Sequence, residues 1–491
     1  MKQDKAETEH VEHYLTRIGK SLDKYLRFEH QDALCPSATW QQELSETVPQ
    51  KGLGIDPVIE LLNHTVIPNG SAIVKPGFTS YITTGATTIA TVASTAASVA
   101  SPQRYTRTAF NYLEELSLDW LADMLQLNNM KGVYSSGGSV ANLIALGGAR
   151  QFTFEKLGID VAAEGVNKPV RVYASEECHH TIQRSMGVLG LARKSVVSID
   201  VDSQGRIQIS DLEEKLNKDI SQGKLPMAII VSAGTTNRGV IDPLFAMGTL
   251  AKRHNIWFHV DGAYGLPGIL DERLKESYKG LELAHSVITD PHKWLGASVG
   301  IAATFVRDRE LLARAFTQEP ADYLEGTVEA SQHDHSTQSQ QLKHSLDSFG
   351  IPFFDYSVEL SAPCRGVVVW AMIKEIGVQG MRERIMRHND MANETANLVS
   401  QHAQLELLGN PELSICCFRF NDPKVKDLNT FNQQLHRQLI RENNYLPSTT
   451  KVNGNLAIRP CYIGARTEFK HVQGLINSVV KIGRVLLETE A

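Results

Sequence analysis

A lysine directly after a short apolar run is the residue of this sequence best placed to do chemistry. Residues 286–295 read SVITDPHKWL, and the β-branched side chains of this run predict a short strand. Because a proline restricts the residue before it, the strand should end at Asp290 and leave Lys293 at its end. For Lys293 alone, an ordinary loop lysine is the simpler interpretation. Its neighbours Asp290, His292 and Trp294 give it anionic and aromatic surroundings rather than a free solvated surface.

A glycine-rich turn ahead of a helical segment is a candidate anion site. Residues 134–143 read YSSGGSVANL, so that Gly138 and Ser139 would open the helix. The free N–H groups of a first helical turn and the positive end of the helix dipole bind anions. Many glycine-rich turns are only turns, and this one gains meaning if a phosphate belongs to the ligand of Lys293.

Three polar candidates follow other predicted strands. In HVDGAYG, Asp261 ends the run WFHV, and a buried carboxylate there is costly unless it meets a cation. Asp261 could keep an aromatic nitrogen base protonated, although a helix-capping aspartate is the alternative. His179, in SEECHHTIQRS, could stack on a planar ligand or simply be surface, and its neighbourhood lacks metal-ligand spacing. Thr235, in SAGTTNRGVIDP, could hydrogen-bond a ring substituent or a carboxylate.

The elements that would position these residues alternate between short apolar runs and helical stretches over residues 131–306. This alternation predicts an α/β fold with a parallel sheet covered by helices. In such sheets ligands bind outside the carboxyl ends of the strands, where each of these clusters falls. The predicted strands are 170–174, 228–232, 256–260, 287–289 and 301–306, and the predicted helices include 212–218 and 245–253.

The remaining segments predict helices around this sheet and a smaller second domain. Residues 10–28 place apolar side chains on one helical stripe, which must pack on the body of the protein or, as we favour, on a second subunit. Residues 85–101 predict a small-residue helix, and the polar stretch 317–342 predicts a mobile loop. We therefore expect an N-terminal helical segment over 1–70, a large cofactor-binding domain over 71–370 and a small C-terminal α+β domain over 371–491.

Composition excludes several classes of partner. A chain of 491 residues with a net charge of −6 has no electrostatic case for nucleic acid or an anionic membrane surface. No run of apolar residues is long enough to span a bilayer, and the polar start MKQDKAETEH lacks the apolar region of a secretory signal. The six scattered cysteines have no CxxC spacing and are expected to be reduced. We expect a cytoplasmic protein.

Together the candidate residues match the needs of one cofactor. Pyridoxal 5′-phosphate requires an amine for its aldehyde, a carboxylate for its ring nitrogen, a flat group for stacking and an anion site for its phosphate. Lys293, Asp261, His179 and the glycine-rich turn would supply these in turn.

The motifs SGGSVANL, SEECHH, HVDGAYG and above all DPHKWL, in this order, resemble those of the group II pyridoxal-phosphate decarboxylases. This family includes the aromatic amino acid, glutamate and cysteine sulfinate decarboxylases. The resemblance covers roughly residues 70–470. It implies fold type I, with a mostly parallel seven-stranded sheet, a small C-terminal domain and an N-terminal segment exchanged in a homodimer that has its active sites at the interface.

The resemblance also implies roles around the cofactor. Lys293 would bind the cofactor aldehyde, and Asp261 would partner the pyridine nitrogen. His179 would stack on one face of the ring and Ala263 would pack on the other, with Thr235 near the ring hydroxyl or the substrate carboxylate. The phosphate would be held by Gly138, Ser139 and His292.

For the substrate, the resemblance points to residues of other segments. Tyr323, in ADYLEG, matches the catalytic-loop tyrosine that donates a proton after carbon dioxide leaves, whereas relatives with phenylalanine there tend to make aldehydes. Arg459 matches an arginine that meets the substrate α-carboxylate in the glutamate enzymes. Tyr81 and Thr83, in SYITTG, would line a substrate pocket that differs from the aromatic-amine enzymes.

The implied reaction is decarboxylation of an L-amino acid to its amine, with an aromatic substrate as the first expectation. Three alternatives stay open. The first is an acidic or diamino acid substrate (glutamate, aspartate, cysteine sulfinate or diaminobutyrate), the second is aldehyde synthesis or other lyase chemistry on the same scaffold, and the third is a non-catalytic homologue.

Overall fold

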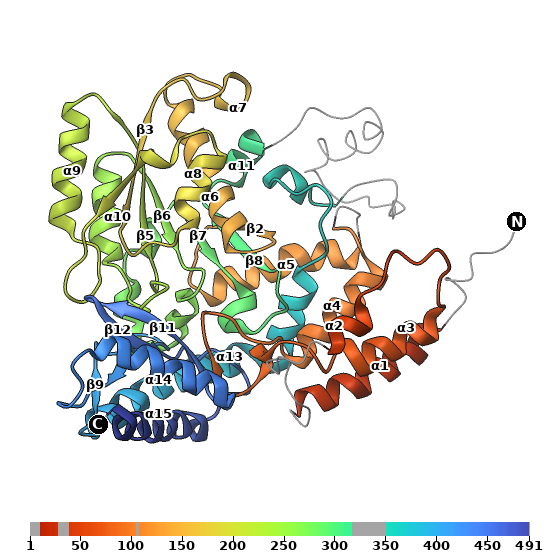
Figure 1. Cartoon of the computed structure of the whole chain (residues 1–491). Coiled ribbons are helices and arrows are strands. Elements are labelled where there is room, and N and C mark those ends of the chain that lie inside the picture. Colours follow the sequence, from red (N-terminus) through yellow and green to blue (C-terminus); the bar gives the residue numbers. More distant parts are fainter. Residues whose placement is uncertain (1–9, 28–38, 105–107, 317–349, 491) are drawn as a thin grey trace, which may run out of the picture.

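A seven-stranded sheet forms the centre of the larger part of the computed structural model (Figure 1), which describes residues 10–27, 39–104, 108–316 and 350–490. Strand β8 runs antiparallel to both of its neighbours, and the other neighbouring strands pair in parallel. This confirms the predicted α/β fold with a mostly parallel seven-stranded sheet. The strand order is β2 (Lys131–Ser135), β8 (Ala302–Val306), β7 (Ser286–Thr289), β6 (Trp257–Asp261), β5 (Leu225–Ser232), β3 (Val170–Ser175) and β4 (Val196–Ile199).

Helices cover this sheet, and the central strands are accordingly apolar. Every residue of β7 and β8 is buried, as expected for strands covered on both faces. Helix α6 packs on β7 and β8, and α10 packs on β5 and β6. The flanking helices are α6 (Gly138–Glu155), α7 (Val161–Glu164), α8 (Thr181–Val188), α9 (Ile209–Ser221), α10 (Leu244–Arg253) and α11 (Arg309–Phe316).

All five strands predicted from the sequence occur in this sheet, within three residues of the predicted limits. Strands β2 and β4 were not predicted. Strand β2 begins at the exposed Lys131 and contains a glycine, and the first three residues of β4 are only partly buried or exposed. Neither run is apolar enough to be recognised as a strand from the sequence, and each becomes a strand through pairing with β8 or β3.

A second, five-stranded sheet lies below the first in Figure 1, beside helices α14 (Leu428–Glu442) and α15 (Phe469–Glu490). Buried residues of these helices, of the end of α13 (Gly366–Ser400) and of strands β9, β10 and β12 form a separate hydrophobic core, from Met391 to Ile482. The edge strand β1 comes from far earlier in the chain and pairs in parallel with β11. The strand order is β1 (Phe78–Thr79), β11 (Leu446–Val452), β12 (Asn455–Arg459), β10 (Phe418–Phe420) and β9 (Leu405–Leu407).

A long helix, α13 (Gly366–Ser400), joins the two parts and contains the predicted domain boundary at 370/371. Its first turns belong to the core of the large sheet, and the second core begins at Met391. A kink at Gly377, whose φ is 66°, divides the helix. The left-handed backbone at this position favours glycine.

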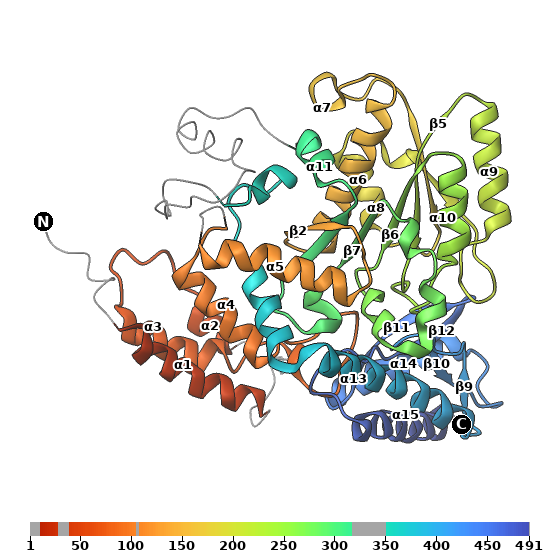
Figure 2. The ribbon, with the colours of Figure 1, turned by 180° about the vertical axis from the view of Figure 1, so that it is seen from behind.

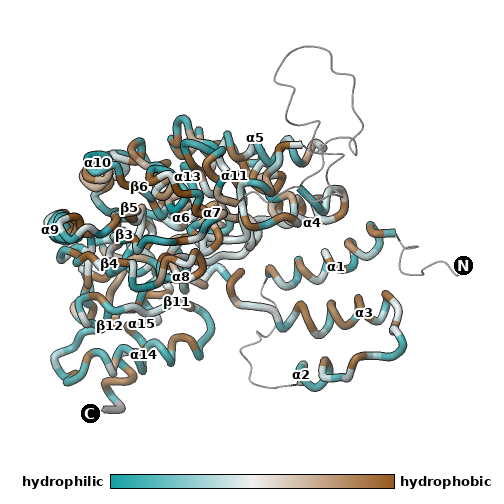
Figure 3. The backbone as a smooth tube through the Cα atoms, turned by 90° about the horizontal axis from the view of Figure 1, so that it is seen from above, coloured by the Kyte–Doolittle hydropathy of each residue, from teal (hydrophilic) through white to brown (hydrophobic). Residues whose placement is uncertain are grey.

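The N-terminal helices extend away from the body of the molecule (Figures 2 and 3). Helix α1 has no buried residue, and its apolar Val11 and Leu15 are exposed. Among the described residues, no helix is both long and apolar enough to cross a membrane. The helices that extend away are α1 (Val11–Leu26), α2 (Thr39–Leu44) and α3 (Ile55–Leu61), whereas α4 (Thr88–Ala100) and α5 (Ala109–Met124) pack on α13.

Short helical turns complete the described part of the chain. The 3₁₀ turns are η3 (Ala72–Val74), η4 (Arg193–Ser195), η5 (Leu266–Leu270), η6 (Glu272–Tyr278), η7 (Leu281–Leu283) and η10 (Phe353–Tyr356). The wider π turns are η2 (Leu62–Val66) and η8 (Pro291–Leu295).

Candidate active site

The carboxyl ends of the parallel strands open onto a cavity of about 360 Å³. Strands β2, β3, β5, β6 and β7 each lead directly into a segment that lines it. This is the edge at which sheets of this type bind ligands. The lining residues are Ser136, Gly137, Gly138, Ser139, Val140, Asn142, His179, Ser232, Gly234, Thr236, Asp261, Ala263, Tyr264, Asp290, His292 and Lys293.

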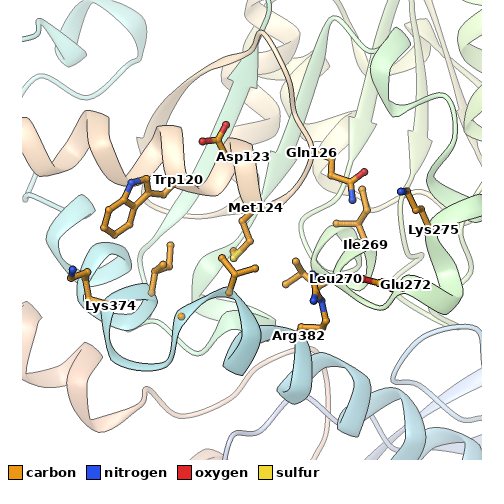
Figure 4. A pocket seen from close by; sticks show the side chains of 13 residues that line it. Trp120, Asp123, Met124, Gln126, Ile269, Leu270, Glu272, Lys275, Lys374 and Arg382 are labelled. Atoms are coloured by element: carbon orange, nitrogen blue, oxygen red, sulfur yellow. Dashed lines mark ion pairs between the residues drawn. The ribbon is translucent and has the colours of Figure 1, made fainter.

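A larger cavity of about 910 Å³ lies elsewhere, between α5, η5 and α13 (Figure 4). Apolar side chains such as Trp120, Met124 and Ile269 line it, together with charged groups including Lys374 and Arg382. Its charged groups do not converge on a reactive amine, so we place the chemistry in the smaller cavity.

Lys293 is held by the π turn η8, which follows β7. The turn gives Lys293 φ and ψ of −92° and −105°, which interrupts the helical geometry, and Nζ lies 3.0 Å from Oδ2 of Asp290. The next residue, Trp294, is fully buried, stacks on Tyr264 with 5.1 Å between ring centroids, and donates from Nε1 to Nδ1 of His388 over 3.0 Å. Packing of Trp294 therefore fixes the lysine turn against both the large domain and α13.

Asp261 lies at the end of β6 and is the final acceptor in a chain of hydrogen bonds. Asn142 Nδ2 donates to its Oδ2 over 3.1 Å, and the backbone N–H of Ala263 donates to its Oδ1 over 3.1 Å. Behind Asn142, the buried His259 donates from Nε2 to Asn142 Oδ1 over 2.9 Å and accepts at Nδ1 from the hydroxyl of Ser286 over 2.8 Å. Burial lowers the pKa of His259 to about 4, so this ring is a neutral relay with its proton on Nε2.

The same asparagine also orients His179. Asn142 Nδ2 donates to Oγ1 of Thr181 over 3.2 Å, so the Thr181 hydroxyl is free to donate to Nδ1 of His179 over 2.8 Å. The backbone N–H of Thr181 also points at that nitrogen. His179 therefore carries its proton on Nε2 when neutral. Burial is the main reason that the pKa of His179 is lowered, against the opposing effect of Asp261.

The glycine-rich turn lines the cavity beside Asp290 and His292. Gly137 precedes the 18-residue helix α6, whose first turn includes Gly138 and Ser139. The first N–H groups of a helix have no intrahelical acceptor and so are available to bind a ligand. Nδ1 of His292 donates to the carbonyl of Ile301 over 2.6 Å, so Nε2 is the ring nitrogen that is left to contact a ligand. Burial lowers the pKa of His292, although Asp290 opposes this effect.

Thr235 and Arg459 are engaged in other contacts. Thr236 lines the cavity, whereas Thr235 is buried and its hydroxyl accepts from the N–H of Val240 over 3.2 Å. Arg459 is 4% exposed and donates to the carbonyls of Asn237 over 2.9 Å and Thr236 over 2.5 Å. The guanidinium of Arg459 is therefore bound to the backbone of the loop that follows β5.

The remaining substrate candidates lie on a neighbouring segment or outside the described residues. Tyr81 is 68% exposed, has a φ of 55°, and accepts a hydrogen bond at its carbonyl from Arg459 over 2.7 Å. Thr83 is partly buried two residues further along the same segment. Tyr323 lies outside the described residues.

Sequence reasoning did not single out Asn142, His259 or Thr236. Asn142 lies four residues after Gly138 on α6, so helical spacing already placed it near the cavity face. The partner of His259 could not be read from the chain because Asn142 is 117 positions away. Thr236 differs from the predicted Thr235 by one position in an irregular turn, where side-chain direction has no simple period.

Comparison with known proteins identifies the class of protein that this fold and cavity define. A model described as the pyridoxal-dependent decarboxylase conserved domain matches residues 38–421. The chain therefore belongs to the pyridoxal-dependent decarboxylase family. It is a carboxy-lyase with pyridoxal 5′-phosphate as its cofactor.

Individual relatives are distant. The chain is 27% identical to an aromatic-L-amino-acid decarboxylase of Bacillus atrophaeus, over 87% of this chain and 85% of the relative. It is also 27% identical to the acidic amino acid decarboxylase GADL1 of Xenopus tropicalis, over 67% of this chain and 61% of the relative. Among solved structures, Oryza sativa TDC with PLP and tryptamine superposes with a TM-score of 0.88 at 22% identity, covering 99% of this chain and 100% of the other. These identities leave the substrate open.

The groups that line the cavity are those that pyridoxal 5′-phosphate requires. The amine of Lys293, the acceptor Asp261 and the open first turn of α6 line one space. Gly138 has no room for a side chain, since a Cβ there would lie 2.7 Å from Oδ2 of Asp290. One group agrees less well with a phosphate, because Asp290 adds a buried negative charge to the same wall.

Proposed function

We propose that this chain decarboxylates an aromatic L-amino acid, releasing carbon dioxide and the corresponding amine. The observation that carries the reaction is the placement of Lys293 and Asp261 in one cavity at the strand ends, in a member of a decarboxylase family. The aromatic substrate is supported by a relative of that activity that matches along most of both chains.

The cofactor, when bound, supplies an electron sink for the bond that breaks. In our proposal Lys293 binds its aldehyde and Asp261 accepts a hydrogen bond from its ring nitrogen. His179 covers one face of the ring and Ala263 the other. The first turn of α6, through Gly138 and Ser139, holds the phosphate together with His292. Thr235, or its neighbour Thr236, would form a hydrogen bond with the ring hydroxyl of the cofactor.

On the substrate side, we assign the proton donor for the α-carbon to Tyr323, on the strength of its match to the family's loop tyrosine. Arg459 would bind the substrate carboxylate, for which it would have to exchange one of its carbonyl partners. Tyr81 and Thr83 would contribute to the side-chain pocket. Exclusion of water would favour protonation of carbon over side reactions.

An acidic substrate is the second candidate. It is favoured by the relative GADL1, an acidic amino acid decarboxylase. Aldehyde formation is a third, since a phenylacetaldehyde synthase of Arabidopsis thaliana is 25% identical over 88% of this chain.

We further propose that the protein acts as a homodimer in the cytoplasm. Helix α1 buries none of its residues, and α4 exposes Val92 and Val99, so these faces are suited to a second copy. The described cysteines are free thiols, which suits a reducing compartment. Sedimentation of the full-length chain should give twice the monomer mass, and a monomer at micromolar concentration would contradict the dimer.

The test is a screen of the common L-amino acids with the full-length protein, following carbon dioxide, amine, aldehyde and peroxide together. We expect stoichiometric carbon dioxide and amine from phenylalanine, tyrosine, tryptophan or a hydroxylated relative. Lys293→Ala, which removes the amine from the same fold, is the control and should be inactive. Activity confined to acidic or diamino acids would overturn the substrate proposal, and aldehyde with peroxide would overturn the reaction.

A further inference from the structure

Asp290 is a buried carboxylate in the wall that we assign to the cofactor phosphate. Its side chain is 1% exposed, and neither oxygen has a hydrogen-bond partner among the described residues. Both oxygens face the start of α6, since a Cβ on Gly138 would lie 2.7 Å from Oδ2 and 3.2 Å from Oδ1. A negative charge therefore already occupies the positive end of this helix.

The charges around Asp290 compensate it only in part. Lys293 Nζ lies 3.0 Å from Oδ2, as an ion pair without hydrogen-bond alignment. Nε2 of His292 is 3.9 Å away, but burial lowers the pKa of this ring, which favours its neutral form. The ammonium of Lys293 is thus the principal counter-charge of Asp290, and it is also the group that binds the cofactor.

We propose that Asp290 acts as a resident counter-anion of this site. It pairs with Lys293 and shares the helix terminus, and it opposes the phosphate of the incoming cofactor. Two negative charges in one poorly solvated cavity repel each other far more than they would in water. The phosphate therefore contributes less to cofactor affinity than the first turn of α6 and His292 alone would give.

Asp290 can influence binding in two ways, and a phosphate-free cofactor separates them. Any effect through the amine of Lys293 applies equally to pyridoxal and to pyridoxal 5′-phosphate. Repulsion of the phosphate applies only to the latter. The ratio of the two dissociation constants, pyridoxal over pyridoxal 5′-phosphate, therefore reports the phosphate contribution alone.

The experiment compares the full-length wild-type protein with Asp290→Asn, after removal of bound cofactor, by titration with each compound. The amide keeps the shape of the side chain and removes its charge. We expect the ratio to rise by at least about tenfold in Asp290→Asn. Asp261→Asn is the matched control, because it removes the same charge from the other carboxylate that lines the cavity. Its ratio should stay within about threefold of the wild type.

The outcomes separate this inference, which rests on the proposed phosphate role of the α6 turn, from the proposed function itself. An unchanged or lower ratio in Asp290→Asn overturns the counter-anion, and so does an equal rise in Asp261→Asn. A wild-type protein that binds neither compound overturns the cofactor site as well. If Asp290→Asn does not fold, Asp290→Ser is held to the same criteria.

Discussion

Replacement of Asn142 by leucine should damage cofactor binding out of proportion to its effect on stability. Asn142 is 1% exposed and joins three groups: it accepts from His259 and donates to Asp261 and Thr181. Leucine has a similar size but can make none of these bonds. The substitution removes the group that orients the carboxylate and, through Thr181, fixes the tautomer of His179.

The expected loss of stability depends on whether each group that loses a hydrogen bond is buried or can reach water. His259 is fully buried, so its orphaned Nε2–H costs about 1–3 kcal/mol of folding stability. Asp261 lines the cavity, where water can replace the lost donor, so it adds little to that cost. The effect on the cofactor comes from the bond between Asn142 and Asp261, which orients the carboxylate for the cofactor. A hydrogen bond to a charged group is worth about 1.5–3 kcal/mol, so its loss should lower cofactor affinity by roughly tenfold to a hundredfold.

The assay is a pair of measurements on each variant: the denaturant midpoint without cofactor and the dissociation constant of pyridoxal 5′-phosphate. Asn432→Leu is the matched control. Asn432 is also fully buried, accepts from the N–H of Phe420 and donates to the carbonyls of Phe420 and Leu428, all in the smaller domain. It should lose comparable stability and keep the wild-type affinity.

The reasoning is refuted if both asparagine variants lose similar stability and both keep cofactor affinity within about threefold of the wild type. Asn142 would then be a structural residue only. Equal losses of affinity in both variants would also refute it, since the effect would then follow from general destabilisation.

Two further predictions concern a proton donor and a buried acid. Tyr323→Phe should lower amine formation by about 10² to 10⁴ with cofactor affinity unchanged, because it removes one positioned proton donor; full decarboxylase activity in steady-state assays would exclude that role. Burial raises the pKa of Glu114 to about 7 from 4.5, with Arg104 opposing the shift. The folded state holds this proton over a window in which the unfolded state has lost it, so stability falls as pH rises from 4.5 to about 7, by on the order of 3 kcal/mol. Glu114→Gln should flatten that slope in denaturant titrations, and an unchanged slope would contradict the assignment.

The sequence was most informative where chemistry coincides with the end of a strand. Lys293 and Asp261 each follow an apolar run, and parallel strands bring their carboxyl ends to one edge, so the cavity could be predicted from spacing alone. The combination of an amine, a carboxylate, an imidazole and an anion site then indicated the cofactor, which the family match supports.

The connections behind those residues could not be predicted. Asn142 meets His259 only because α6 packs across the sheet, and no local pattern records that contact. The direction of Asp290 toward α6 depends on the irregular turn at Lys293. The engagement of Arg459 with backbone carbonyls depends on a loop conformation rather than on residue type.

The most direct test of the central claim is to reduce the cofactor-loaded protein with borohydride and to map the modified residue by peptide mass spectrometry. Reduction makes the bond between a lysine and the cofactor aldehyde permanent, and the account predicts a single modified peptide that carries the cofactor on Lys293. Label on another lysine, or a protein that takes up no cofactor, would contradict it.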